Sequence, residues 1–338
     1  MPGDSLLRRF AGDPGYDRVA ARIAAALPQV RRAREAHRVH VDGLVPEGLA
    51  ADLRDGALFV GDMNGRAILR IDRRGRVTRF ADRLDLRPLG MAVDPARGLL
   101  WVATSDSFIA GSPPRSALLA FDLTSGRLRQ RVSPGEARSL NDLAIAPDGT
   151  IFVTDSLGGA LFRLDPGGVA LAPVTPEGAM SYPNGVALSA DARFVFVAQG
   201  VAIRRIEAAT GEIVSLALPP GLALLGIDGL YGHRGRLVAV QNGGTPGRVL
   251  LLGLSADLRA ISEYRLLEAG HPDFDIPTTG AIVGDRFVFI ANSQLTRLAD
   301  DGTIAAGPPL APVALLEVAL PRDAENARAP ARNAAAPG

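Results

Sequence analysis

From about residue 43 onward, short apolar runs alternate with turn signals along the chain. The first group of runs reads LAADL, ALFVGD, AILRID and VTRFA, and MNGR and RRGR separate its later members. The third group follows the same order with LAIA, TIFVTD, ALFRLD and VALAPV, joined by PDG, SLGG and PGG. Short strand-like runs joined by Asp-Gly and Gly-Gly turns predict antiparallel hairpins. Each group therefore predicts a unit of four strands.

A strand-start signal returns six times along the chain. The copies read PEGLAAD at 46, PLGMAVD at 88, LNDLAIAPDG at 140, PNGVALSAD at 183, GIDGLYG at 226 and TTGAIVG at 278. When the small or turn-forming residues at 48, 90, 142, 185, 229 and 280 are aligned, the intervals are 42, 52, 43, 44 and 51 residues. A period of this size indicates a stacked or closed array of one supersecondary unit. Six units of four strands predict an all-β fold, a six-bladed β-propeller.

The two ends of the chain have a different composition. Residues 1–36 are rich in Arg and Ala and carry Val19, Ile23 and Leu27 at helical spacing, which predicts a helical extension packed outside the propeller. The propeller is expected over 37–320. Residues 321–338 are small, polar and Pro-containing, a composition that predicts a disordered tail.

The sixth unit needs an outer strand to complete the ring. It provides AIVGD, FVFIAN and LTRLAD, and either VALLEVAL at 313–320 or HRVHVD at 37–42 can supply the fourth strand. We favour the amino-terminal run, because pairing the two ends of the chain removes an exposed sheet edge.

Composition narrows the chemistry. The 338 residues carry a formal net charge of +1 with scattered basic residues, so neither nucleic acid nor an anionic membrane is an expected partner. The sequence has no Lys and no Cys, which excludes lysine Schiff bases, thiolate nucleophiles, cysteine-zinc sites and disulfides. We expect a small-molecule substrate and a monomer or small homo-oligomer.

No run of residues approaches the length of a membrane-spanning helix, and the amino terminus lacks the apolar core of a secretory signal. The expectation is a soluble protein. It would be cytoplasmic as given, or periplasmic or secreted if a signal peptide has been removed.

The residue before each aligned position adds a functional signal. In four of the six copies this residue has a side-chain oxygen that can bind a metal ion, and these residues are Glu47, Asn141, Asn184 and Asp228. The first strand of each blade lines the central channel of a propeller, so two carboxylates and two amides should converge at its mouth. Hard oxygen ligands suit Ca²⁺ first, with Mg²⁺, Mn²⁺ or Zn²⁺ as alternatives. Turn chemistry explains each residue alone. Their shared phase favours a metal, because crowded buried carboxylates need a cation.

The second strand of each blade ends on the same face, so its loop can add substrate-binding groups. The candidates are Asp106, Asp155, Gln199, Gln241, Asn242 and Asn292, together with His271 just before the sixth inner strand. Ordinary turn chemistry explains each of them about as well. Leu89 and Thr279, which occupy the ligand phase in the other two copies, are expected to shape the pocket. The long loop 105–116 is a candidate lid.

The chain resembles the gluconolactonase and senescence-marker-protein family of six-bladed propellers, and more distantly the paraoxonases. The motifs PEGLA, LNDLAIAPDG, YPNGVALSAD and GIDGLYG carry the resemblance, which runs over roughly residues 43–300. It implies that Glu47, Asn141, Asn184 and Asp228 bind one divalent cation and that Asp228 is also the base. Sugar-lactonase members often have Arg where this chain has Ser139. The acid that a second, paraoxonase-like calcium would need is replaced by Gly48.

The function that follows is a divalent-metal-dependent hydrolase that opens a lactone or related ester. The metal would act as Lewis acid and Asp228 as base. No GxSxG elbow is present to supply a serine nucleophile. One alternative is a non-hydrolytic enzyme on the same cation site, such as an isomerase, a lyase or a strictosidine-synthase-like condensing enzyme. Another is a ligand- or protein-binding propeller with a structural cation.

Overall fold

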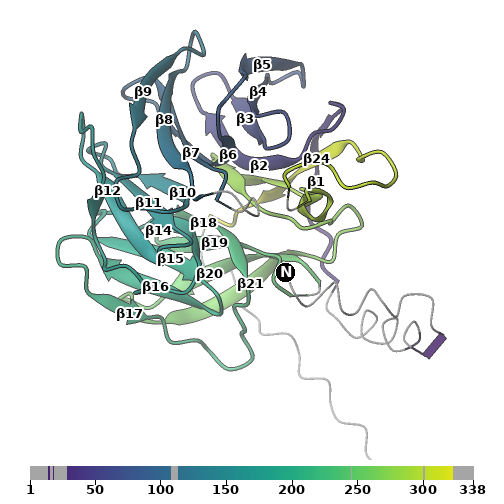
Figure 1. Ribbon diagram of the computed structural model, residues 1–338. Coiled ribbons are helices and arrows are strands. Elements are labelled where there is room, and N and C mark those ends of the chain that lie inside the picture. Colours follow the sequence, from purple (N-terminus) through teal and green to yellow (C-terminus); the bar gives the residue numbers. More distant parts are fainter. Residues whose placement is uncertain are drawn as a thin grey trace, which may run out of the picture.

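The computed structural model describes residues 14, 15, 18, 29–107, 113–244, 246–299 and 301–322. These residues form six four-stranded antiparallel sheets arranged around a common centre (Figure 1). The predicted all-β, six-bladed propeller is thus confirmed.

Blades 1 to 5 share one plan, in which four consecutive strands pair in chain order from the centre outward. Blade 1 consists of β2 (Pro46–Asp52), β3 (Ala57–Asp62), β4 (Ala67–Ile71) and β5 (Val77–Ala81). Blade 2 consists of β6 (Arg87–Asp94), β7 (Leu99–Ser105), β8 (Ser116–Asp122) and β9 (Leu128–Val132). Blade 3 consists of β10 (Leu140–Ile145), β11 (Ile151–Asp155), β12 (Ala160–Leu164) and β13 (Ala172–Pro173). Blade 4 consists of β14 (Pro183–Leu188), β15 (Phe194–Gln199), β16 (Ala202–Glu207) and β17 (Ile213–Ser215). Blade 5 consists of β18 (Ile227–His233), β19 (Arg236–Gln241), β20 (Arg248–Leu254) and β21 (Ile261–Ala269).

Blade 6 is built from both ends of the chain. Its order from the centre is β22 (Gly280–Val283), β23 (Arg286–Ile290), β24 (Val313–Ala319) and β1 (Arg34–Val39). The amino-terminal strand is therefore the outer strand, as favoured from the sequence, and Val39 pairs with Val313. The expected third strand LTRLAD is wrong, because the run at 313–319 takes its place. Residues Leu295–Arg297 form a short 3₁₀ helix, η1, on a segment that leaves the sheet to pack elsewhere.

The predicted helical extension at 1–36 falls largely outside the described residues. Of those described, 14, 15 and 18 are helical, but they do not form an element, so the extension as a whole is not seen. Its last part is extended, and β1 begins at Arg34. Val30 forms a bridge with Ala269, and the buried Glu268 accepts hydrogen bonds of 2.6 Å from the backbone N–H groups of Arg32 and Ala33. These contacts keep the segment extended as far as the start of β1. The predicted tail also lies outside the described residues, except for 321 and 322.

The hydrophobic core lies between adjacent blades. Between blades 1 and 2, for example, Phe59 and Phe80 of blade 1 meet edge to face with ring centroids 4.7 Å apart. Phe80 also contacts Phe121 of blade 2. Each blade is buried on both faces, which explains why its central strands read as nearly continuous apolar runs. The inner strands contact their neighbours around the ring and so fix the geometry of the channel.

A β-bulge at the start of the inner strand explains the repeated strand-start signal. In blades 1 to 5 the pairing register shifts near the start of the inner strand, for example between Leu140 and Leu143 and between Pro183 and Val186. The two residues inside each bulge leave the ladder, and such bulges re-aim side chains. The first of the two is the predicted ligand position.

The second bulge position is small for a steric reason. A Cβ atom added to Gly90 would lie 2.3 Å from Asp142 Oδ1 and 2.7 Å from the carbonyl oxygen of Asn141, on the next inner strand. A Cβ added to Gly185 would lie 2.5 Å from the carbonyl oxygen of Asp228. The inner strands approach so closely at these glycines that a side chain has no room. Blade 3 differs, because Asp142 occupies the second bulge position there.

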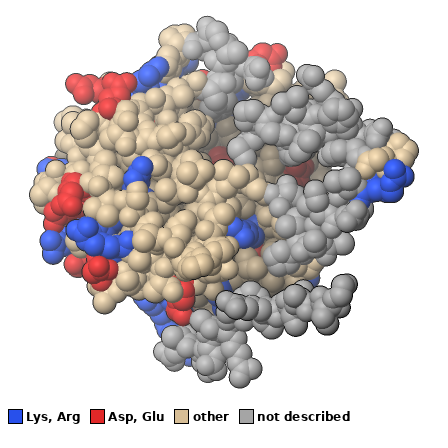
Figure 2. Space-filling model, turned by 90° about the horizontal axis from the view of Figure 1, so that it is seen from below, with Lys and Arg blue, Asp and Glu red and all other residues tan. Residues whose placement is uncertain are grey.

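The part of the chain described here contains no helix with the length and apolar character needed to cross a membrane. Figure 2 shows basic and acidic side chains interspersed over one side of the molecule, without a large patch of one sign.

Candidate functional site

The bulges bring the four predicted ligand residues to the same end of the channel, on the inner strands of four blades. Glu47 lies on β2, Asn141 on β10, Asn184 on β14 and Asp228 on β18. Asn184 Nδ2 donates a hydrogen bond of 2.6 Å to Asp228 Oδ1, so two of the four are in direct contact. Their role as metal ligands stays a prediction.

Both asparagines use their amide nitrogens within the protein. Asn141 Nδ2 donates to Ser156 Oγ at 2.8 Å, and Asn184 Nδ2 donates to Asp228 as described. Among the described residues, no hydrogen bond engages the amide oxygen of either asparagine. An amide whose nitrogen is held in this way leaves its oxygen for another partner. This is the orientation that a cation ligand requires.

Glu47 is the least satisfied acidic residue of the channel. Its side chain is buried, and Oε2 has no hydrogen-bond partner among the described residues. Burial raises the pKa of Glu47 well above its usual value, and the negative charges of Asp228 and Asp142 raise it further. The neighbouring Thr278 hydroxyl lowers this pKa to a smaller extent, but Thr278 Oγ1 itself makes no well-formed hydrogen bond.

Asp228 is held by two amides. Asn242 Nδ2 donates to its Oδ2 at 2.6 Å, opposite the bond from Asn184, and also to the carbonyl oxygen of Pro277 at 3.0 Å. Burial raises the pKa of Asp228, whereas the hydrogen bonds from Asn242 and Asn184 oppose that rise. Asn242, a predicted substrate-binding residue, is therefore part of the carboxylate centre.

Asp142 is a third buried carboxylate that the sequence analysis missed. Burial raises its pKa to about 7, and the charge of Asp228 adds to the rise. The backbone N–H groups of Leu143 and Val186 donate to it at 2.9 and 3.3 Å and act in the opposite direction. A signal was present, because Asp142 is the only non-glycine among the six aligned small or turn-forming positions.

The three carboxylates share one electrostatic environment, to which no cationic side chain of the described residues contributes. The charge of Asp228 raises the pKa of both Glu47 and Asp142, and no arginine contributes to the pKa of any of the three. When only His, Cys, Asp and Glu are counted, the described residues contain no group of three that could hold a metal ion. The predicted set differs in kind, because two of its four members are amides.

Two tyrosines complete the surroundings of the carboxylates. Tyr231 is buried beneath them, and its hydroxyl oxygen accepts a hydrogen bond of 2.7 Å from the N–H of Gly280. Burial raises the pKa of Tyr231 well above its usual value, and the charge of Asp142 contributes. Tyr182 immediately precedes β14 and stands at the mouth, where burial and the charges of Asp228 and Glu47 raise its pKa.

The other predicted substrate-binding residues are mostly engaged within the protein. Asp155 accepts hydrogen bonds from the backbone N–H groups of Arg138, Ser139 and Gly158. Gln199 accepts one from the N–H of Ser181, and Gln241 binds the carbonyl oxygen of Leu225 and the guanidinium of Arg248. Asn292 binds the backbone of Pro312 and Ala314. His271 Nδ1 accepts from the N–H of Asp273, and its ring lies beside Phe274.

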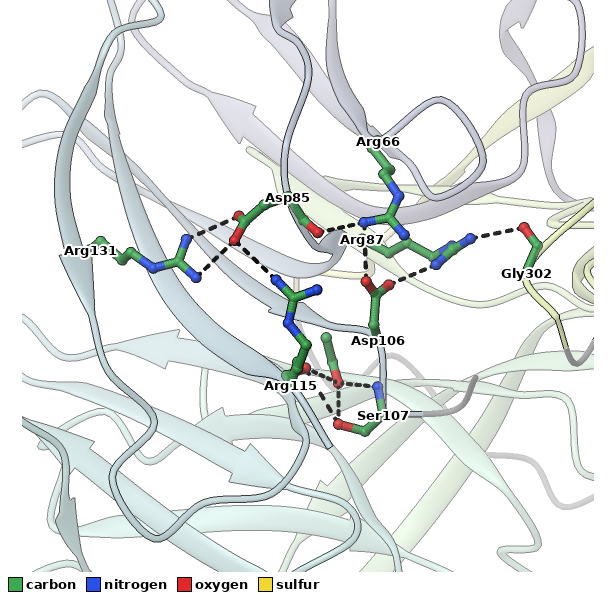
Figure 3. A network of polar contacts seen from close by, with 9 residues as sticks. Arg66, Asp85, Arg87, Asp106, Ser107, Arg115, Arg131 and Gly302 are labelled. Atoms are coloured by element: carbon green, nitrogen blue, oxygen red, sulfur yellow. Dashed lines mark hydrogen bonds and ion pairs between the residues drawn. The ribbon is translucent and has the colours of Figure 1, made fainter. Parts of the chain in front are cut away.

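Asp106 belongs to a buried ion-pair network (Figure 3). Its carboxylate lies 2.7 Å from Arg87 Nη1 and 3.0 Å from Arg66 Nη1. Arg87 also donates to the carbonyl oxygen of Gly302 at 2.8 Å. Gly302 lies on the segment between β23 and β24, so the network ties blade 2 to blade 6. The candidate lid cannot be assessed, because its residues 108–112 lie outside the described residues.

The segment between β23 and β24 covers the mouth beside blades 1 and 2. Its apolar residues Leu295, Leu298, Ile304 and Leu310 pack on Val45, Met63 and Leu89. Leu89 is thereby buried, and Thr279 is buried with its hydroxyl accepting a hydrogen bond from the N–H of Gly48. Leu89 and Thr279, which were expected to shape the pocket, are therefore largely buried away from it.

Comparison with known families agrees with this architecture. A family model described as the SMP-30/gluconolactonase/LRE-like region matches residues 45–216, about half of the chain. The chain therefore belongs to this family. A search of curated proteins found no match.

Several solved structures have a similar fold. A gluconolactonase of Xanthomonas campestris gives a TM-score of 0.58 at 20% identity, over 88% of this chain and 99% of the other. Regucalcin of Agrobacterium tumefaciens, described as a calcium-binding protein, gives 0.55 at 17% identity, over 87% and 98%. A virginiamycin B lyase of Staphylococcus aureus gives 0.55 at 16% identity, over 83% and 88%. At these identities the likeness establishes the fold alone.

Proposed function

We propose that this protein is a divalent-metal-dependent hydrolase that opens a lactone or a related ester at the mouth of its channel. The observation that carries the proposal is the buried Glu47 Oε2, which has no hydrogen-bond partner within the described part of the chain and lies within the electrostatic reach of Asp228. A buried carboxylate in this situation needs a cation or a proton. Family membership and the lactonase among the structural neighbours support the reaction class.

The residues present fit a hard divalent cation. Glu47 and Asp228 would supply carboxylate oxygens, and Asn141 and Asn184 would supply amide oxygens that no protein donor engages. Two carboxylates balance the charge of one divalent ion. The all-oxygen set favours Ca²⁺, with Mg²⁺ or Mn²⁺ as alternatives, and the calcium-binding regucalcin neighbour is consistent with this choice. When bound, the ion would act as a Lewis acid toward the substrate carbonyl.

Asp228 is the proposed general base. Its two oxygens accept hydrogen bonds from Asn184 and Asn242, which fix the plane of the carboxylate. Burial raises its pKa toward neutrality, which makes a carboxylate a better proton acceptor while it remains ionised. Asp228 would take a proton from the attacking water and return it to the leaving oxygen as the ring opens. The exposed part of the mouth admits both water and substrate.

The test uses a panel of lactones and esters with protein stripped of metal and then reloaded with Ca²⁺, Mg²⁺ or Mn²⁺. We expect acid release that requires the metal and falls by roughly 10²- to 10⁴-fold in Asp228→Asn. Asp165→Asn, an exposed change on the opposite end of blade 3, serves as the control and should keep full activity. Hydrolysis that survives both metal removal and Asp228→Asn would eliminate the proposal. A folded, metal-loaded protein that turns over none of these compounds would favour a non-hydrolytic reaction.

A further inference from the structure

Large apolar side chains are exposed at the same end of the channel as the carboxylates. Leu157, Tyr182, Val201 and Leu225 are 41%, 58%, 66% and 46% exposed. Each lies on a loop beside the start of an inner strand. Leu157 follows Asp155, which pairs with Leu140, and Val201 lies just beyond Gln199, which pairs with Pro183. Tyr182 immediately precedes β14, and Leu225 lies just before β18. We call these four residues the apolar rim.

Backbone hydrogen bonds tie the loops of the apolar rim together. The N–H of Gly178 donates to the carbonyl oxygen of Gly158 at 2.7 Å, which joins the segment before Tyr182 to the turn of Leu157. The N–H of Gly226 donates to the carbonyl oxygen of Gly200 at 2.8 Å and so joins the loops of Leu225 and Val201. The rim is therefore a continuous feature of blades 3 to 5.

The two sides of the mouth differ in access. Beside blades 1 and 2 the segment between β23 and β24 packs over Leu89 and Val45. Beside blades 3 to 5, Asn141, Asn184 and Asp228 remain partly exposed. A substrate that approaches the carboxylate centre from the side of blades 3 to 5 therefore passes the apolar rim.

Few polar side chains on that path remain for substrate hydroxyl groups. Asp155 is buried and accepts hydrogen bonds from three backbone N–H groups, and Gln199 is bound to the backbone of Ser181. Arg138 is directed toward Glu177, 3.7 Å away. The Ser139 hydroxyl is buried against Ser105 at 3.2 Å. A polyhydroxylated ligand would find apolar surface where it needs donors and acceptors.

Tyr182 connects the apolar rim to the carboxylates. It is 58% exposed and lies two residues before Asn184, whose amide nitrogen donates to Asp228. Its backbone φ of +50° is unusual for a residue with a bulky side chain. Such strain is characteristic of functional positions.

We propose that the preferred substrate is a lactone or ester whose non-reacting part is apolar, an alkyl chain or an aryl ring that lies on the apolar rim. This inference rests on the hydrolase function proposed above and names its substrate class. Contact with Leu157, Tyr182, Val201 and Leu225 removes apolar surface of the substrate from water. Each methylene that is fully buried should improve kcat/KM by about fourfold.

The experiment measures kcat/KM of the Ca²⁺-loaded protein on γ-lactones with unbranched side chains of increasing length, with gluconolactone as the polar comparison. We expect a stepwise rise until the chain outgrows the rim. Val201→Ser and Leu225→Ser should each flatten the series by about threefold or more for the long chains. The matched controls Val169→Ser and Leu53→Ser remove the same side chains from more exposed positions at the opposite end of the propeller and should leave the series unchanged.

A second readout separates this proposal from the reaction itself. Alkyl-substituted γ-lactams, which are not hydrolysed, are titrated into the same proteins by calorimetry. Lactam affinity that rises with chain length and falls in Val201→Ser supports the apolar rim. This holds even if no lactone is hydrolysed, because a failure of hydrolysis would contradict only the proposed hydrolase function. Metal-dependent hydrolysis with no dependence on chain length, or with gluconolactone preferred, overturns the substrate class and leaves the hydrolase function standing. Lactam affinity that is independent of chain length also overturns it.

Discussion

Glu47 and Glu317 are glutamates with the same exposure in opposite electrostatic situations. Glu47 is 6% exposed and Glu317 is 7% exposed. Glu317, on β24, is paired with Arg34 at 2.6 Å and Arg286 at 2.5 Å, one for each carboxylate oxygen. Glu47 has no cationic partner, and one of its oxygens has no hydrogen bond among the described residues. Glu317 therefore stabilises the closure of the ring, whereas Glu47 is left for a partner from outside the protein.

The buried Glu268 extends the contrast to the seam between blades 5 and 6. Its Oε2 accepts hydrogen bonds from two backbone N–H groups of the amino-terminal segment. Its Oε1 has no hydrogen bond among the described residues, but Arg31 lies 3.7 Å away. Arginines therefore stand beside the buried glutamates at both seams. Within the described residues no arginine pairs with Glu47, Asp142 or Asp228, and this difference marks the functional end. Unpaired buried charge is costly, so its concentration at one place calls for a function.

The largest expected effect is that of Glu47→Gln. Because it removes a proposed ligand, kcat/KM on the best lactone should fall by roughly 10²-fold or more. The metal-free protein should lose no stability, since a repelling carboxylate has been replaced by a neutral group. Calcium should raise the Tm of the wild type and not that of the variant. A Glu47→Gln protein that keeps its activity and its calcium response would contradict the proposed site.

The second prediction concerns the pH dependence of the metal-free protein. Asp142 has a pKa of about 7 in the folded state and the ordinary value of 3.8 for Asp when unfolded. The folded state therefore binds more protons between these values, so the free energy of unfolding should decrease as pH rises from about 4 to about 7. The expected loss is on the order of a few kcal/mol.

Urea unfolding in the presence of a chelator, measured across this range, tests the prediction. Asp142→Asn should flatten the profile, and Asp165→Asn should not. A metal-free wild type that becomes more stable over this window would show that Asp142 is ionised at little cost. Saturating calcium should reverse the loss, because the ion binds only the folded protein.

The strand period, the outer strand of the closure and the equivalent placement of the four candidate residues at the inner-strand bulges could be predicted from the sequence, because local patterns repeat along the chain. The role of these residues as ligands stays a prediction. The role of Asp142 could not be predicted, since a turn-forming residue at 142 reads like the glycines at 90 and 185 until the packing of the inner strands is known. The course of 295–310 was misread for a related reason. LTRLAD has the composition of a strand, but Leu295 and Leu298 pack on another blade. Non-local packing decided both cases.

The third prediction concerns the closure. Glu268→Ala leaves the backbone N–H groups of Arg32 and Ala33 without their acceptor, so the free energy of unfolding should fall by about 1–3 kcal/mol. Lactone hydrolysis by the folded protein should stay unchanged, because the seam does not touch the channel. Denaturant unfolding and kcat/KM measure the two effects, and Glu212→Ala, an exposed change, is the control. Loss of activity without loss of stability would link the seam to the site.

The smallest effect is expected at Arg34. This side chain is 75% exposed, so water screens its ion pair with Glu317, and Arg34→Ala should cost no more than about 1 kcal/mol. Arg286, which is 48% exposed, still pairs with the other oxygen. Removing both arginines should cost more than the sum of the single changes, because Glu317 then becomes a buried acid without a cation, as Glu47 is. A double-mutant cycle on the free energy of unfolding measures this excess. Strict additivity would mean that Glu317 tolerates the loss of both arginines. Glu47 and Glu317 would then differ in their place in the fold rather than in their ion pairs.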